Sequence, residues 1–483
     1  MLFPPFKVII MEDLRMCKRF FSILLALTLL FAVALPAFNA QAALFEKPDI
    51  TLSSSHALVV NLNTGVEVFG VGADETVFPA STTKILTAVL VIEACPDLEE
   101  KIDVTKSAMN RVDLYSSQAG LLVGEHISIR DLLGLLMVKS ACDAASVLAE
   151  HVAGSEEAFA ELMNAKAQEL GCTGTHFVNS SGTHDVNHYT TPRDMSVITQ
   201  YALKSPAFIE FFSMKQVQTS ETNLSKKRFF STTNYLIDAN RGGKYYYKFA
   251  TGGKTGTTTP AGRCLVSTAQ KGEAEYLCLV FGADGDSAKG TNKAFDDTIA
   301  LYKWCFEKLS VVKIASNEGA QFETKLRYAW NHDYVTLTVS DDVYAIMPTG
   351  ADATVNRDDA EGTATGLLVS ADIPDHLDAP VAQGDPAGTA TYFYRDEDGT
   401  VTTLATGSIV VYESVDRNFF AFIFTKIGAF FSSTPVLIIF IVLVTGLVGF
   451  IVYRLIIRSR TRRRPAFRRH KRMKANYRRS FRR

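Results

Sequence analysis

The apolar and polar positions of the chain change their period several times between residues 56 and 309. Two short alternating runs flank an Asn-Thr-Gly turn at 56–70 and predict a β-hairpin. Helical spacing of apolar residues follows in three stretches, 83–95, 129–151 and 156–170. Strand patterns and a last helix come next, at 254–259, 262–269, 275–282 and 293–309. Strands at both ends of a helical block predict an α/β (α+β) fold whose terminal segments share one sheet.

Past about residue 312 the pattern changes to short alternating strands, which predict a small separate all-β domain. The clearest runs are 334–339, 389–394 and 408–412. This stretch carries no cluster of histidines, cysteines or paired acids in a chemical arrangement. A spacer or docking module is therefore the expected role.

Both ends of the chain carry long apolar runs. Near the N-terminus, Lys18-Arg19 precede the apolar run 20–35 and the small residues Ala40-Gln-Ala42, which is the pattern of an export signal. At 435–453 an uncharged run has about the ~20 residues that a membrane-spanning helix needs. The aromatic-rich segment before it, 415–434, predicts either an interfacial segment or an extended start of the span.

Charge is distributed unevenly along the chain. The formal net charge of −1 conceals a tail, 454–483, with fifteen Lys or Arg residues and no acid. The positive-inside rule places this tail in the cytoplasm and the body of the chain on the outer side of the cell membrane. The rest of the chain is acidic, which argues against binding of nucleic acid.

Cysteine and histidine spacing does not indicate a metal site. The six cysteines that follow the export signal form no Cys-x-x-Cys pair. Buried free thiols are favoured over a disulfide, although Cys264 and Cys278 lie on a predicted hairpin. His184 and His188 lie in a loop pattern without a His-Glu-x-x-His helix. We therefore expect neither a metal ion nor a cofactor.

The most informative short pattern is Ser81-Thr-Thr-Lys84, which lies at the start of a predicted helix. If Ser81 opens that helix, Lys84 lies one turn along on the same face and can take the hydroxyl proton. A serine hydroxyl is a poor nucleophile without such a neighbour. The free N–H groups of the helix N-terminus also suit an oxyanion that forms beside Ser81. Alone, the pattern is equally compatible with a capping serine and a solvated lysine.

Two further motifs follow in order. In Lys139-Ser-Ala-Cys142 a serine ends a helix, and the Ser140 hydroxyl could relay a proton between Lys84 and a leaving amine. In Gly252-Gly-Lys-Thr-Gly-Thr257, Lys254 and Thr255 on a strand edge can hold a substrate carboxylate. Gly256 would keep side-chain bulk away from an approaching backbone.

With these motifs in this order, the chain resembles the low-molecular-mass D-alanyl-D-alanine carboxypeptidases, a family of penicillin-binding proteins. The resemblance runs from His56 to about Ser414 and includes Phe177 to Gly182 and His188 to Met195. It implies a transpeptidase-like fold, an antiparallel sheet flanked by helices with a mainly helical lobe, and the family's β-rich C-terminal domain.

The resemblance also implies a chemistry. Ser81 would be acylated, Lys84 would be the base, Ser140 would shuttle a proton, and Lys254 with Thr255 would bind the terminal carboxylate. The backbone N–H groups of Ser81 and Thr257 would form the oxyanion hole. The implied enzyme is a membrane-anchored serine carboxypeptidase that removes the terminal D-alanine of peptidoglycan stem peptides and is inactivated by β-lactams.

The expected organisation therefore has six parts. They are a signal peptide at 1–43, a catalytic domain at 44–311, a small β domain at 312–414, an interfacial linker at 415–434, a transmembrane helix at 435–453 and a cytoplasmic tail at 454–483.

One residue departs from the family pattern. Cys142 stands where the family usually has asparagine, and a thiol both donates and accepts hydrogen bonds only weakly. We expect Cys142 to face the substrate groove beside Ser140 and to bind the substrate less well than asparagine would.

Several alternatives to a carboxypeptidase stay open. A DD-transpeptidase or DD-endopeptidase is the nearest, because the sequence does not decide which acceptor takes the acyl group. A serine β-lactamase is less favoured, since no Glu-x-x-Leu-Asn segment is present to activate a deacylating water. A non-catalytic binding protein is opposed by the intact Ser81, Lys84, Ser140 and Lys254.

Overall fold

The computed structural model describes residues 48–286, 289–329, 332–357, 363–397, 399–432 and 438–458. The export signal predicted at 1–43 and the tail beyond residue 458 lie outside these residues. The chain divides into two compact units. One unit holds the chain up to Ser316 together with Asp341–Ala371 and Thr389–Gly407, and the other holds Asn317–Ser340, Asp372–Gly388 and the chain from Ser408.

A five-stranded antiparallel sheet forms the centre of the first unit, in the order β2-β1-β9-β8-β7. Its strands are β1 (His56–Asn61), β2 (Glu67–Val71), β7 (Ala250–Thr258), β8 (Gly262–Lys271) and β9 (Ala274–Ala283). β1 and β2 form the hairpin predicted at 56–70, and β1 pairs with β9 along its whole length. Segments about two hundred residues apart thus share one sheet, as the strand–helix–strand pattern predicts.

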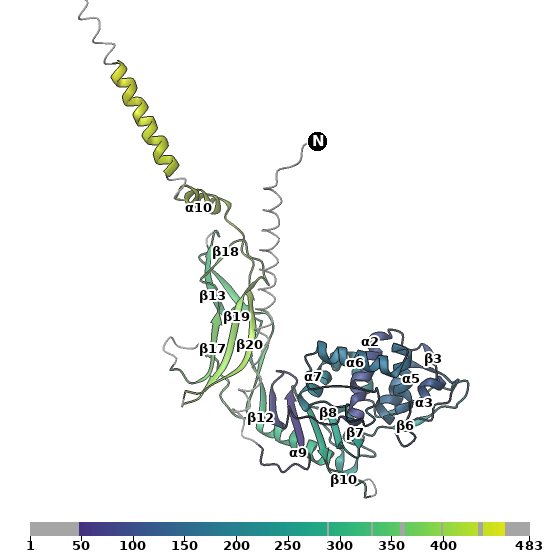
Figure 1. Ribbon diagram of the computed structural model, residues 1–483. Helices are drawn as coiled ribbons and strands as arrows, with labels where there is room; N and C mark the ends of the chain where they lie inside the picture. The colour runs from purple at the N-terminus through teal and green to yellow at the C-terminus, as the bar shows by residue number, and fades with distance from the viewer. Residues whose placement is uncertain are drawn as a thin grey trace, which may run out of the picture. The chain divides into compact units, whose positions relative to one another are not determined.

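The two faces of this sheet belong to two separate hydrophobic clusters. In β1 the buried side chains alternate, with Leu58 and Val60 in one cluster and Ala57 and Val59 in the other, as the two-residue period of a strand requires. The helix α9 (Lys293–Lys308) covers the second face, where Tyr302 is fully buried. A helical lobe covers the first face, and Figure 1 shows α9 apart from that lobe.

The helical lobe is built from elements between the two halves of the sheet. They are η2 (Ala80–Thr83), α2 (Lys84–Ala94), α3 (Lys106–Asn110), α4 (Ile129–Gly134), η3 (Leu135–Lys139), α5 (Cys142–Ala153), α6 (Glu156–Glu169), α7 (Pro192–Ala202) and α8 (Pro206–Phe212). Smaller elements in the same unit are β3 (Lys101–Asp103), β4 (His126–Ser128), β5 (Gln216–Gln218), β6 (Phe229–Ser231), η4 (Gly243–Tyr245), β10 (Gly285–Asp286) and β11 (Thr291–Asn292).

Helix boundaries follow local signals in the sequence. The side chain of Ser155 accepts a hydrogen bond from the Ala158 N–H at the start of α6, and Thr191 caps α7 in the same way ahead of Pro192. The helix predicted at 129–151 is interrupted. A π-helical turn, η3, ends at Ser140, whose φ of 63° is left-handed, and α5 begins after it.

From Leu309 to Val411 every regular element among the described residues is a β-strand, as predicted. A two-stranded sheet pairs β12 (Leu309–Ala315) with β15 (Val343–Pro348), and a seven-stranded sheet has the order β16-β17-β19-β20-β14-β13-β18. Its strands are β13 (Phe322–Arg327), β14 (Tyr334–Val339), β16 (Asn356–Arg357), β17 (Gly366–Asp372), β18 (His376–Asp378), β19 (Pro386–Arg395) and β20 (Val401–Val411). The predicted fold class, mixed helix and sheet followed by a strand domain, is therefore confirmed.

Two helices follow the strand domain. α10 (Phe419–Ser432) covers the aromatic-rich segment, and the helix Ile438–Arg458 is long and apolar enough to cross a membrane. The second helix overlaps the span predicted at 435–453 and ends five residues later.

Candidate active site

Ser81 lies on a single turn of 3-10 helix, η2, directly before α2. The turn begins at Ala80, whose φ of 47° is left-handed although alanine has a Cβ. The loop after Asn179 packs against it: a Cβ at Gly182 would lie 1.8 Å from the Ala80 carbonyl oxygen. The backbone that presents Ser81 is thus strained and tightly enclosed, which is common at functional sites.

Lys84 begins α2 and is completely buried. Its Nζ lies 3.0 Å from Ser81 Oγ and 3.4 Å from Cys142 Sγ, and it donates a hydrogen bond to the Ser181 carbonyl oxygen. The structure therefore brings the serine and lysine of the first motif into direct contact, in the geometry that proton transfer requires.

Ser140 and Lys254 form a second serine–lysine contact. Lys254 Nζ donates to Ser140 Oγ at 2.9 Å and to the Thr255 carbonyl oxygen at 2.9 Å. Both side chains are buried, with exposures of 7% for Ser140 and 1% for Lys254. The amine of Lys254 is thus bonded to Ser140. Thr255 lines the open pocket, whereas Lys254 does not.

Burial lowers the pKa of both lysines. For Lys84 desolvation is the largest cause, and the neighbouring Cys142, Asp143 and Glu156 oppose it. For Lys254 desolvation is again the largest cause, and repulsion by Lys84 adds to it. A neutral Lys84 can accept a proton from Ser81 while its remaining N–H groups point to Cys142 and Ser181.

The strand β7, which carries the third motif, is one of the two edge strands of the five-stranded sheet and packs against η2. A Cβ at Gly256 would lie 3.0 Å from the Pro79 carbonyl oxygen and 3.1 Å from the Ser81 nitrogen. Gly256 therefore allows β7 to approach the backbone of the Ser81 turn. This close approach brings the edge of β7, with Thr257, next to Ser81.

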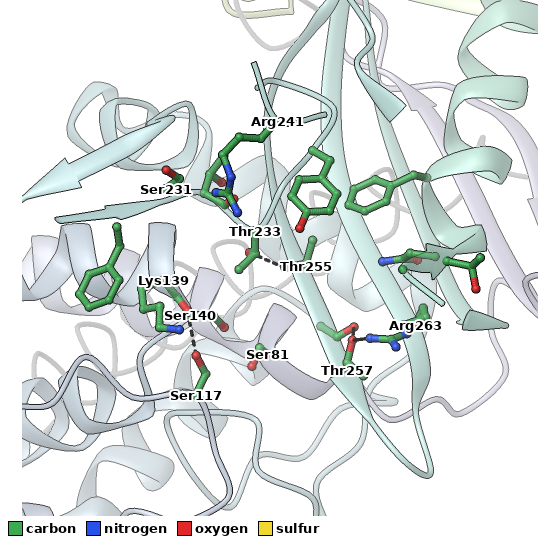
Figure 2. Close-up of a pocket in the computed structure, with 18 of the residues that line it drawn as sticks. Ser81, Ser117, Lys139, Ser140, Ser231, Thr233, Arg241, Thr255, Thr257 and Arg263 are labelled. Atoms are coloured by element: carbon green, nitrogen blue, oxygen red, sulfur yellow. Dashed lines mark hydrogen bonds between the residues drawn. The ribbon is translucent and has the colours of Figure 1, made fainter. Parts of the chain in front are cut away.

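A pocket of about 640 Å³ opens between these elements (Figure 2). Of the predicted site residues, the pocket is lined by Ser81, Ser140, Thr255, Gly256 and Thr257. Figure 2 shows Ser81 between Lys139 on one side and Arg263 on the other. The volume falls within the range of about 300–1,000 Å³ that is usual for small-molecule sites.

Cys142 lies elsewhere than expected. Its side chain is 6% exposed, does not line the pocket and places Sγ against the amine of Lys84. The expectation that this thiol faces the groove is not met, because Cys142 is the first residue of α5 and points toward α2. All six cysteines of the described residues are buried and free, in line with the favoured interpretation.

Several residues that support the site were not singled out from the sequence. Asn179 Oδ1 accepts hydrogen bonds from the backbone N–H groups of Ser181, Gly182 and Thr183, and so shapes the loop that contacts Lys84. The buried Asp143 carboxylate accepts hydrogen bonds from the N–H groups of residues 119–121, beside the pocket residue Ser117. Two features of the sequence could have pointed to these residues. They are Asn179-Ser-Ser-Gly182 and Asp143, which directly follows the second motif.

Within residues 48–458, apart from the undescribed gaps, no group of three or more His, Cys, Asp or Glu side chains is arranged to hold a metal ion. His188, one of the histidines considered, is buried, and its Nε2 lies 2.8 Å from Thr83 Oγ1. Burial lowers the pKa of His188 to about 3, so the ring is neutral.

Comparisons with known proteins place the chain in a family. A sequence model of the D-alanyl-D-alanine carboxypeptidase family matches residues 41–285, about half of the chain. A second model, of the C-terminal domain of penicillin-binding protein 5, matches residues 312–412. The chain belongs to the D-alanyl-D-alanine carboxypeptidase family and is a serine-type carboxypeptidase.

Individual relatives agree with this assignment. The chain is 28% identical over 381 residues to the D-alanyl-D-alanine carboxypeptidase DacF of Bacillus subtilis. The match covers 77% of this chain and 89% of the relative. It is 31% identical over 267 residues to a D-alanyl-D-alanine carboxypeptidase of Streptomyces sp. strain K15. That match covers 52% of this chain and 89% of the relative. The crystal structure of penicillin-binding protein 5 from Haemophilus influenzae has a TM-score of 0.62 at 22% identity, covering 77% of this chain and all of that chain, which shows the shared fold.

The close packing of Gly182 on the Ser81 turn gives a first prediction. Gly182→Ala should greatly slow acylation by a penicillin and destabilise the domain, because the new methyl group would collide with the Ala80 carbonyl. The matched control is Gly154→Ala, which has a similar φ of 81° but nothing within 4 Å of the added Cβ. That control should lose only about 1–2 kcal/mol and acylate normally. Equal effects of the two substitutions, measured by thermal unfolding and labelling rate, would refute the packing argument.

The burial of Lys84 gives a second prediction. Because its pKa is lowered from the ordinary 10.5, the neutral amine forms at lower pH than in an exposed lysine. The acylation rate should therefore rise with pH and level off below the ordinary lysine value. Lys84→Arg, which puts a permanently charged group there that cannot deprotonate, should lower this rate by about 10²–10⁴-fold. The control is Lys106→Arg, at an exposed position. A normal acylation rate in the Lys84 variant would exclude Lys84 as the base.

Proposed function

We propose that this enzyme removes the terminal D-alanine from peptidoglycan stem peptides through an acyl-enzyme on Ser81. The observation that carries the proposal is the contact of 3.0 Å between Lys84 Nζ and Ser81 Oγ at a buried amine. A neutral lysine in this position acts as a general base, and the pocket beside it has room for the end of a peptide.

The proposed reaction has two halves. Lys84 takes the proton of Ser81, and Oγ attacks the carbonyl carbon of the penultimate D-alanine. The oxyanion lies near the backbone N–H groups of Ser81 and Thr257, on two elements that Gly256 allows to approach. The amine of the terminal D-alanine takes a proton through Ser140 and leaves, and water then hydrolyses the ester by the reverse path.

Lys254 has an indirect part in this scheme. Its Nζ donates to Ser140 Oγ, so a charged Lys254 would favour proton release from Ser140 to the leaving amine. Binding of the substrate carboxylate near Thr255 would stabilise that charge. The same site should be acylated by β-lactams, whose ring amide takes the place of the scissile bond.

We further propose that the enzyme is anchored by its C-terminal helix with the catalytic domain outside the cell membrane. The apolar helix at Ile438–Arg458 and the fifteen basic residues of 454–483 support this orientation. The domain boundaries proposed above, with an export signal at 1–43 and catalysis within 44–311, are consistent with it.

The direct test of the proposed function is release of D-alanine from a peptide that ends in D-Ala-D-Ala. The wild-type enzyme should release D-alanine, and Ser81→Ala should not, although its fold is kept. Ser117→Ala is the control, because Ser117 lines the same pocket and its hydroxyl donates a hydrogen bond to the Lys139 carbonyl, away from Ser81 and Lys84. No release by the wild-type enzyme, or equal release by Ser81→Ala, would exclude the proposal.

Orientation in the membrane gives a separate prediction. A protease added to intact cells without their wall should digest the catalytic domain and leave an epitope tag at the C-terminus uncut. This follows because translocation of the basic tail opposes the positive-inside bias. A tag that is cut before the cells lyse would reverse the orientation.

A further inference from the structure

A second pocket lies in the first unit, away from Ser81. It encloses about 440 Å³ where the segment before β7 meets the end of β8 and the last turns of α9. Three lysines line it, Lys248, Lys271 and Lys303, together with four aromatic side chains and one acid, Glu307. Among the described residues, none lines both this pocket and the one beside Ser81. This lysine pocket is therefore separate from the candidate active site.

The floor of the lysine pocket is aromatic and fixed to the core. The Tyr247 ring stacks on the Tyr302 ring, with centroids 5.9 Å apart, and Phe306 stacks on the same ring at 6.3 Å. The Phe249 ring lies 5.8 Å from the Phe306 ring. Tyr302 itself is fully buried, and its hydroxyl donates to the Ser267 carbonyl oxygen at 2.6 Å. The pocket is thus built on a rigid base rather than on a loose surface.

The aromatic floor also positions the cations. Lys248 Nζ lies 4.8 Å from the centre of the Phe249 ring, and Lys271 Nζ lies 5.6 Å from the same ring. An ammonium group within about 6 Å of a ring face is attracted to it. In the part of the chain that the structure describes, none of the three lysines forms an ion pair. Because the chain before its basic tail is acidic, this cluster is a local positive region that attracts anions.

Tyr246 adds an exposed ring to the same pocket. Its side chain is 42% exposed, so one aromatic surface is available at the rim. The face of an aromatic ring carries partial negative charge, and the weakly positive C–H groups of a sugar ring pack well on such a face. Sugar rings combined with anionic groups are therefore the ligand chemistry that fits this wall.

The strand β7 connects the lysine pocket to the pocket beside Ser81. Phe249 directly precedes β7, and Thr255 and Thr257 farther along the strand line the other pocket. At about 3.3 Å per residue, Thr255 lies about 20 Å from Phe249 along the strand. A polymer can occupy both pockets at once, whereas the end of a short peptide fills only one.

We propose that the lysine pocket is a second binding site for the polymeric substrate, a peptidoglycan strand that it recognises by sugar rings and free carboxylates. The strand lies on Tyr246 and the three lysines while one of its stem peptides enters the pocket beside Ser81. This inference rests on the proposed function, because it takes its ligand from the same polymer. It makes the enzyme prefer a strand to a free peptide with the same end.

The kinetic test compares soluble, un-cross-linked peptidoglycan strands with a free peptide that has the same D-Ala-D-Ala end. Release of D-alanine by the full-length enzyme in detergent is measured on both. The wild-type kcat/KM per stem peptide should be at least about fivefold higher on the strand, because a second contact raises the local concentration of substrate. Added salt should reduce this preference, since it screens exposed charges.

Variants assign the preference to the lysine pocket. Lys248→Glu combined with Lys303→Glu should remove most of it and leave hydrolysis of the free peptide near the wild-type rate. Both side chains are exposed, so their replacement leaves the core intact. The matched control, Lys106→Glu combined with Lys204→Glu, makes the same change in net charge at exposed positions outside both pockets. Tyr246→Ser removes the exposed ring and should also weaken the preference.

Binding probes separate sugar rings from charge. Hyaluronan carries carboxylates on sugar rings, whereas polyphosphate carries charge without rings. Calorimetry compares the two double variants, which both keep the basic tail 454–483, so that their difference reports the pocket. The pocket variant should bind hyaluronan several-fold more weakly than the control variant. Tyr246→Ser should weaken binding of hyaluronan and leave binding of polyphosphate unchanged.

The outcomes separate this inference from the proposed function. Equal kcat/KM on strand and peptide, or a preference that the pocket variant keeps, would overturn the inference and leave the carboxypeptidase standing. An equal loss in the control variant would assign the preference to net charge and overturn it as well. If Tyr246→Ser weakened both probes equally or neither, the glycan would be excluded as the ligand. Failure to release D-alanine from either substrate would instead remove the proposed function, and hyaluronan binding would still test the pocket by itself.

Discussion

The burial of an amine beside a hydroxyl is the constraint on which the rest of this site depends. Lys84 is completely enclosed, and that enclosure lowers its pKa, as the role proposed for it as the base for Ser81 requires. Full enclosure needs walls on every side. Cys142 on α5, the Ser181 carbonyl on the Asn179 loop and the Ser81 turn itself provide them. The pKa of the second buried amine, Lys254, is lowered mainly by its own burial and further by repulsion from Lys84.

The enclosure of Lys84 depends on backbone segments that approach one another closely. The pairing of β1 with β9 brings the N-terminal hairpin into the sheet whose edge strand is β7, so Ser81 and the third motif become neighbours. Gly256 and Gly182 then allow β7 and the Asn179 loop to reach the Ser81 turn at distances that a side chain would block. Ala80, which a Cβ at either glycine would contact, has a left-handed backbone, which fits strain that is maintained by tight surroundings. Ser140, which accepts a hydrogen bond from Lys254, is also left-handed.

Sequence reasoning reached most of the architecture and the contact between Ser81 and Lys84. Ser81 with Lys84 could be placed because three residues of helix put them on one face, and the shared sheet followed from strand patterns at both ends of a helical block. It could not place Cys142, since the choice between groove and interior depends on the direction of α5, which the break at Ser140 sets. Nor could it find the partners of Lys84 in the Asn179 loop, about a hundred residues away, or the lysines gathered from α9, the end of β8 and the segment before β7. These are tertiary contacts without a local period.

The central claim is that Ser81 is the group that becomes acylated because Lys84 beside it is a buried, neutral base. The most direct measurement is intact-protein mass spectrometry of the enzyme after mixing with a penicillin, followed by digestion to locate the adduct. The account predicts one penicillin per chain, attached to the peptide that contains Ser81, and no adduct in Ser81→Ala. The absence of an adduct, or an adduct on another residue such as Cys142, would contradict it.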